Sequence, residues 1–174
     1  MHDFTDIAYL QNGPTFHQQV YDLLTRRQLL SGLSAFSPVF AGSIPINVHT
    51  AGSDIDIICC FDNKELFITC VTELFQQYPD FALREITIRE IPAVVANFTT
   101  DGQPVEVFGQ AIPVKEQMAY RHLLIEAAIL QQKGEDFRRQ VISLKAQGYN
   151  TEAAFCHLLD IPGDPFLELL KWKP

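Results

Sequence analysis

The chain has 174 residues, of which 47% are hydrophobic and 20% charged, so it is not a disordered chain and can form one domain with a small appendage. Its net charge is −8 and no basic run is present, which argues against a nucleic-acid partner. No signal peptide pattern and no stretch of roughly 20 apolar residues occurs, so we expect a cytoplasmic protein that does not bind a membrane. The four cysteines lack zinc-site spacing, and we interpret them as reduced core residues.

The first half of the chain predicts helices and strands that alternate. Apolar residues at i, i+4 and i+7 predict a helix over about 15–32, with Thr15 as its cap. A short strand is expected over 36–43, a loop over 44–53 and a second strand over 54–61. The next helix begins after Asp62 or Asn63, which can each cap it.

The second half predicts a β-meander followed by helices. The runs "FALREITIRE", "AVVANFTT" and "QPVEVFGQ" read as three strands, the last two joined by the turn "DGQ". Beyond Pro113 the residues favour helix, with Gly134 and Gly148 as stops and with Asn150 and Asp164 as caps. We therefore expect an α+β layered fold, with a mixed-sheet core over 1–113 and a helical segment over 114–174 packed on it.

Three acidic residues stand in apolar strands. Asp54 and Asp56 are two residues apart, so their side chains share one face of a strand, while Ile55 faces the core. Glu106 lies between valines, and if its strand is beside 54–61 the three carboxylates converge. A divalent cation would remove their repulsion, and Mg²⁺, with Mn²⁺ as an alternative, prefers such oxygen ligands. The plainer alternative is that these acids only face solvent on a half-exposed strand.

Small residues precede the acids and a polar trio follows them. Gly42 allows a phosphate to approach the backbone closely, and Ser43 offers an N–H and a hydroxyl. With Ser53 they are the candidate nucleotide-binding residues. Three polar residues on the first C-terminal helix could contact the substrate: Arg121, His122 and Glu126. The alternative is that they form an ordinary surface ion pair and a partly buried histidine.

The pattern from Ala41 to Asp56 resembles the signature of the nucleotidyltransferase superfamily that shares the polymerase-beta catalytic fold. That signature is a hydrophobic residue, Gly, Gly or Ser, about a dozen residues, two acids separated by one hydrophobic residue, and a third acid on a later strand. Here Gly42-Ser43, ten residues over 44–53, Asp54-Ile55-Asp56 and Glu106 match it. The resemblance implies that the acids hold metal and catalyse transfer, and that Gly42 and Ser43 hold phosphates.

A narrower resemblance covers nearly the whole chain. The stretches "AGSIPINVHTAGSDIDIIC", "VEVFGQAIPV", "QMAYRHLLIE" and "TEAAFCHLL" are similar to a family of bacterial proteins known only as a domain of unknown function. This implies the nucleotidyltransferase-type sheet flanked by helices but brings no substrate. Pro45 departs from better-known relatives, because no helix pattern follows Gly42-Ser43.

Three functional hypotheses follow. The first is a Mg²⁺-dependent nucleotidyltransferase that moves a nucleoside monophosphate from an NTP, ATP first, to a small-molecule or protein acceptor. The second is a catalytically weak regulatory protein, antitoxin-like, that binds nucleotide, metal and a protein partner. The third is a sheet domain without a ligand, whose acids face water.

Overall fold

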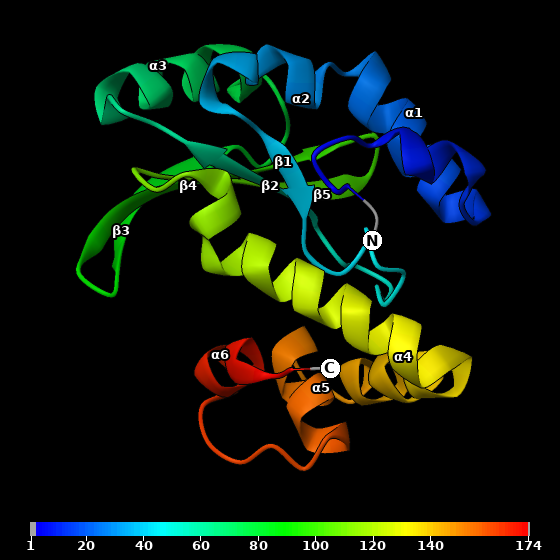
Figure 1. Cartoon of the computed structure of the whole chain (residues 1–174). Coiled ribbons are helices and arrows are strands. Elements are labelled where there is room, and N and C mark those ends of the chain that lie inside the picture. The colour runs from blue at the N-terminus through cyan, green and yellow to red at the C-terminus, as the bar shows by residue number, and fades with distance from the viewer. Residues whose placement is uncertain (1–2, 174) are drawn as a thin grey trace. The chain divides into compact units, whose positions relative to one another are not determined.

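The computed structural model describes residues 3–173 and divides into two compact units (Figure 1). The sheet unit comprises residues 3–41 and 54–117, and the helical unit comprises residues 42–53 and 118–173. The loop 42–53, which the sequence assigns to the core, thus groups with the helices. In residues 3–173 no helix combines the length and the apolar character that crossing a bilayer requires.

The sheet unit is built on one mixed five-stranded sheet in the order β1-β2-β5-β4-β3. The strands are β1 (Val39–Ala41), β2 (Ile55–Cys60), β3 (Ala82–Ile88), β4 (Ile91–Thr100) and β5 (Gln103–Gln110). Only the β2–β5 pair is parallel, and the other three pairs are antiparallel. The predicted meander of three strands is confirmed as β3–β4–β5.

A two-residue turn fixes the register between β4 and β5. Asp101 and Gly102 both have positive φ, 51° and 75°, as a type I′ hairpin turn requires. Thr100 therefore pairs with Gln103, and every later pair on these strands follows from that first one. The register of the site strand β5 against β4 is set locally by this turn.

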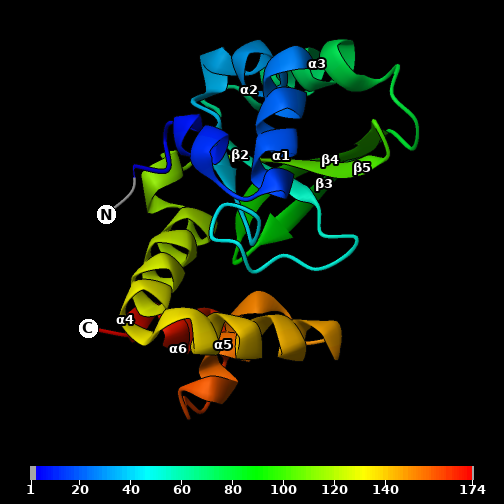
Figure 2. The same ribbon diagram turned by 90° about the vertical axis from the view of Figure 1, so that its right-hand side faces the viewer.

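Helices α1 (Thr15–Arg26), α2 (Leu29–Gly32) and α3 (Lys64–Phe75) lie over one face of the sheet (Figures 1 and 2). The prediction of one continuous helix over 15–32 is wrong, because Gln28 adopts a left-handed conformation with φ 54° and separates α1 from α2. Thr15 is the first helical residue and not a side-chain cap. Asn63 does cap α3, since its side chain accepts a hydrogen bond from the Leu66 N–H at 2.8 Å.

The core of the sheet unit is aromatic where α3 meets the sheet. Phe67 is fully buried, and its ring meets Phe36 edge-on at a centroid distance of 4.9 Å. Phe75 stacks on Phe98 of β4 at 4.6 Å. Burying each such ring stabilises the fold by roughly 1.5–3 kcal/mol, so this layer holds β4 and β5 in place.

The helical unit contains α4 (Met118–Ala146), α5 (Thr151–Leu158) and α6 (Pro165–Glu168). Gly134, with φ 79° and ψ −167°, has a non-helical backbone that divides α4 into two helices at a kink, so the predicted helix stop at Gly134 is confirmed. The predicted caps are confirmed: Asn150 accepts from the Ala153 N–H, and Asp164 accepts from the Phe166 N–H. Short 3-10 helices complete the chain at Ala8–Asn12, Ser34–Phe36, Val114–Glu116 and Leu169–Lys171.

Candidate functional site

Two of the three predicted acids are direct neighbours in the sheet. Asp56 of β2 and Glu106 of β5 are register partners in the parallel ladder. Ile55 and Ile57 flank Asp56 and are fully buried, so strand alternation places the Asp56 carboxylate on the opposite face. Partners in a ladder lie roughly 5 Å apart and present their side chains on the same face, which makes these two a carboxylate pair.

Asp54 lies just outside this pair. It precedes β2 by one residue and is exposed, whereas Asp56 is half-buried. Within residues 3–173, no three His, Cys, Asp or Glu side chains are arranged to hold a metal ion. The structure therefore brings together two of the acids and leaves the third beside them in the chain. Mg²⁺ nonetheless commonly binds only one or two protein carboxylates, with water and substrate phosphates as its other ligands. The donor set fits that ion.

The Glu106 carboxylate is held through one of its two oxygens. Its Oε2 accepts a hydrogen bond from Asn97 Nδ2 at 3.1 Å, and Arg84 Nη2 lies 3.9 Å from the same atom. The Glu106 side chain is 32% exposed, so it lies at the surface of the sheet face and not inside the core. No described residue makes a hydrogen bond or ion pair with Oε1, which leaves that oxygen for chemistry.

Asn97 is a site residue that the sequence analysis missed. It lies on β4 directly opposite Glu106, and its Oδ1 is buried without a hydrogen-bond partner among the described residues. The amide orientation follows from electrostatics, because turning Oδ1 toward an ionised carboxylate would set two acceptors against each other. A signal did exist in the sequence: counting back from the Asp101-Gly102 turn pairs position 97 with position 106.

The predicted nucleotide-binding residues lie in the loop of the helical unit. Gly42 has φ 77°, a conformation that favours glycine, and Ser43 is buried. The Ser43 carbonyl accepts a hydrogen bond from the Val48 N–H at 3.0 Å. Ser53 Oγ accepts from the Thr50 N–H at 2.9 Å. Residues 44–47 form a turn and no helix, as the lack of a helix pattern around Pro45 predicts.

The loop is tied to α4. Arg138 donates to the carbonyl oxygen of Ile46, and the same nitrogen lies 3.4 Å from the carbonyl of Asn47. Asn47 itself has φ 58° and donates its N–H to the Ile44 carbonyl at 2.9 Å. A guanidinium that spans two successive carbonyls fixes the backbone downstream of Gly42-Ser43.

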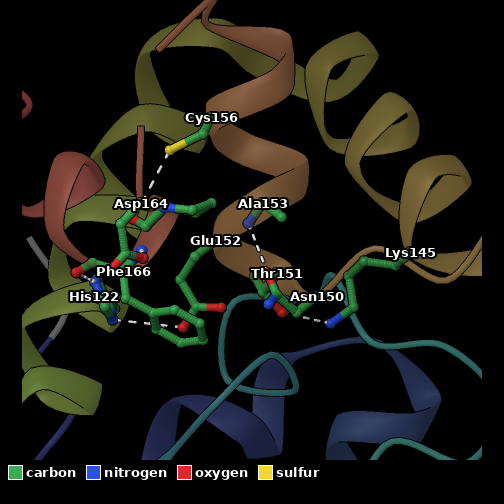
Figure 3. A network of polar contacts seen from close by, with 10 residues as sticks. His122, Lys145, Asn150, Thr151, Glu152, Ala153, Cys156, Asp164 and Phe166 are labelled. Atoms are coloured by element: carbon green, nitrogen blue, oxygen red, sulfur yellow. Dashed lines mark hydrogen bonds and ion pairs between the residues drawn. The ribbon is translucent and has the colours of Figure 1, made fainter. Parts of the chain in front are cut away.

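The predicted trio on α4 does not act as one set. Arg121 is exposed, whereas His122 and Glu126 are each 3% exposed. In Figure 3 the His122 ring meets α5 and α6: Nε2 is 3.0 Å from the Phe166 carbonyl oxygen, and Nδ1 is 3.5 Å from Glu152 Oε1. Burial raises the pKa of Glu126 well above its ordinary value, and the neighbouring carboxylate of Glu152 raises it further. His122 and Glu126 thus belong to the packing of the helical unit.

Comparison with known proteins finds one family and one fold. The profile of a family described as Domain of unknown function (DUF4269) matches residues 22–172. No curated protein matches the chain. A mutant Cid1 poly(U) polymerase bound to MgATP superimposes with a TM-score of 0.57 at 15% identity, covering 82% of this chain and 48% of that one.

Two further solved structures show the same likeness. The GLD-2/RNP-8 complex gives a TM-score of 0.55 at 16% identity over 92% of this chain and 66% of that chain. The polymerase core of TRAMP, an RNA surveillance complex, gives 0.52 at 11% identity over 94% and 50%. The chain spans less than two thirds of each of these proteins, and at such identities the likeness establishes the nucleotidyltransferase fold.

Proposed function

The chain belongs to the DUF4269 family, whose function is unknown, and we propose that it is a Mg²⁺-dependent nucleotidyltransferase. It would transfer a nucleoside monophosphate from an NTP, ATP first, to a hydroxyl or phosphate of an acceptor. The observation that carries this proposal is the pairing of Asp56 with Glu106 across two parallel strands, in a fold whose solved neighbours include polymerases bound to MgATP and MgGTP.

Each candidate residue has a role in this proposal. Asp54, Asp56 and Glu106 would hold Mg²⁺, which when bound neutralises phosphate charge and favours displacement at the α-phosphorus. Glu106 Oε1, which has no described partner, would accept the proton of the acceptor hydroxyl as its oxygen bonds to the α-phosphorus and pyrophosphate leaves. The backbone of Gly42 and Ser43, with Ser53, would bind the outer phosphates.

The charge of the chain points to the class of acceptor. The titles of two solved neighbours name a poly(U) polymerase and the polymerase core of an RNA surveillance complex, but this chain carries 21 acidic against 13 basic residues. A net charge of −8 disfavours a polyanion, because affinity for nucleic acid depends on releasing counterions from phosphates that Lys and Arg neutralise. A small molecule or a protein side chain is therefore the proposed acceptor.

Label transfer tests this function. The protein, a cell extract, Mg²⁺ and each α-labelled NTP are incubated together, and we expect a labelled acceptor and released pyrophosphate. Asp56→Asn should abolish transfer with folding retained. Asp62→Asn is the matched control, because Asp62 is an exposed acid just beyond the end of β2. Unchanged turnover in Asp56→Asn would refute the role of the carboxylate pair.

A second function has one observation in its favour. Asp54 is exposed and precedes β2, so the ladder pairs two carboxylates where the transferase signature has three acids, which suits a protein that binds metal, nucleotide and a protein partner with little turnover. Thermal unfolding with ATP and Mg²⁺ separates the two, because a ligand at 100 times its Kd adds about 2.7 kcal/mol of stability. If ATP and Mg²⁺ stabilise the protein but no pyrophosphate is released, the regulatory function is supported. If no combination of Mg²⁺ and NTP stabilises the protein, the third hypothesis, a sheet domain without a ligand, is supported.

A further inference from the structure

Glu106 has two chemically equivalent oxygens, but the structure treats them differently. Asn97 Nδ2 lies 3.1 Å and Arg84 Nη2 3.9 Å from Oε2, whereas no described residue makes a hydrogen bond or ion pair with Oε1. An N–H donor on one oxygen restrains the rotation of a carboxylate and so limits the directions in which the other oxygen can point. Oε2 is therefore the oxygen that the protein binds, and Oε1 is the oxygen that remains for a ligand.

Asn97 has a feature that a purely structural asparagine would not need. Its Oδ1 is buried and has no hydrogen-bond partner among the described residues, which costs stability. A leucine of nearly the same shape would avoid that cost, because Val95, which shares the Asn97 face of the strand, is apolar and buried. The asparagine is explained by what Nδ2 does for Glu106, with Oδ1 as the consequence of that orientation.

We propose that Asn97 is a positioning residue of the site: its side-chain amide holds Glu106 Oε2 so that Oε1 is presented to the metal and to the acceptor. This inference rests on the proposed function, because it assumes that Asp56 and Glu106 bind the cation. Arg84, whose side chain is 58% exposed, adds charge near the same oxygen, while the amide supplies the directional bond. Outer residues that orient metal ligands typically change metal affinity by 10–100-fold when they are replaced.

Binding of Mn²⁺ alone to the full chain, measured by calorimetry, tests this role without any need for turnover. Asn97→Leu should weaken Mn²⁺ binding about 10–100-fold. The same variant should be at least as stable as the original protein in urea, since it removes a buried unpartnered acceptor. A residue with only a structural role would show the reverse: lower stability and unchanged Mn²⁺ affinity.

Two further variants make the result specific. Thr99→Val is the matched control, because Thr99 shares the strand and the face of Asn97 but bonds Asp80 at 2.8 Å instead of Glu106, and it should bind Mn²⁺ as the original does. Asn97→Thr keeps a good strand former without the amide, and it replaces Asn97→Leu if that variant does not fold.

The outcomes distinguish this inference from the proposed function. If Asp56→Asn loses Mn²⁺ binding while both Asn97 variants bind normally, the inference is wrong and the carboxylate site stands. If Asp56→Asn and the Asn97 variants all bind as the original does, the metal site itself is refuted and the inference falls with it. Weakening by Asn97→Leu and Asp56→Asn, with Thr99→Val unchanged, supports both.

Discussion

Replacing Gly109 by alanine should destabilise the sheet unit through a clash that can be read from the structure. A Cβ at this position would lie 2.4 Å from Phe67 Cε1 and 2.6 Å from Cζ, where carbon atoms normally stay 3.5–4.0 Å apart. The Phe67 ring is fully buried and is held by Phe36 at 4.9 Å and Phe61 at 5.3 Å, so it cannot swing away. The ring or strand β5 would have to move by about 1 Å.

The size of the effect follows from two opposing contributions. Overpacking of this kind costs about 1–3 kcal/mol, and the loss of chain entropy in the unfolded state returns roughly 0.4–1 kcal/mol, since Gly109 does not need a positive φ. We expect a net loss of about 1–2 kcal/mol in the free energy of unfolding, or roughly 2–8 °C in Tm. Urea unfolding followed by circular dichroism measures it.

A control and a double variant test the cause. Gly32→Ala at the end of α2 meets only the flexible methyls of Leu74 at 3.3 Å, so it should be neutral or stabilising. Phe67→Leu should relieve the clash, so that the double variant with Gly109→Ala is less destabilised than the sum of the two single changes. If Gly109→Ala proves as stable as the original, or if the two effects simply add, the contact between β5 and α3 is not as tight as described.

Three other predictions concern stability and reactivity. Burial raises the pKa of Glu126, so as pH rises the unfolded chain ionises this group before the folded chain does, and the protein loses stability. In urea titrations from about pH 4 to about pH 8, the free energy of unfolding of Glu126→Gln should therefore rise relative to that of the original protein. A difference that stays constant with pH would contradict this. Burial also raises the pKa values of Cys60 and Cys70, so their thiols should react slowly with Ellman's reagent in the folded protein at neutral pH. All four cysteines should react in denaturant. Fast reaction of Cys60 and Cys70 in the folded protein would show that these thiols are not protected. Asn63→Ala removes the cap of α3 and should cost about 1 kcal/mol in thermal unfolding, whereas Asn63→Asp should retain most of it.

Where the sequence predicted structure correctly, the signal was local. Asn63, Asn150 and Asp164 cap helices because an acceptor side chain at that position bonds the next orphan N–H groups, whatever surrounds them. The prediction failed at Gln28, where the apolar spacing continues through a left-handed residue that breaks the helix. Periodicity records which side of a segment is buried, and it does not record a change of direction between two helices on the same core.

In the candidate site, too, local sequence signals predict some features and the tertiary structure decides the others. Strand alternation alone places Asp56 on the face opposite Ile55 and Ile57, and the Asp101-Gly102 turn alone sets Asn97 opposite Glu106. Only the tertiary structure decides that β2 pairs in parallel with β5, and so sets position 56 beside position 106, because parallel pairing joins segments far apart in the chain and no turn specifies its register. It also decides that the Asn97 amide bonds Oε2 of Glu106 and that the Arg84 guanidinium lies 3.9 Å from the same oxygen, since that depends on where three strands place their side chains.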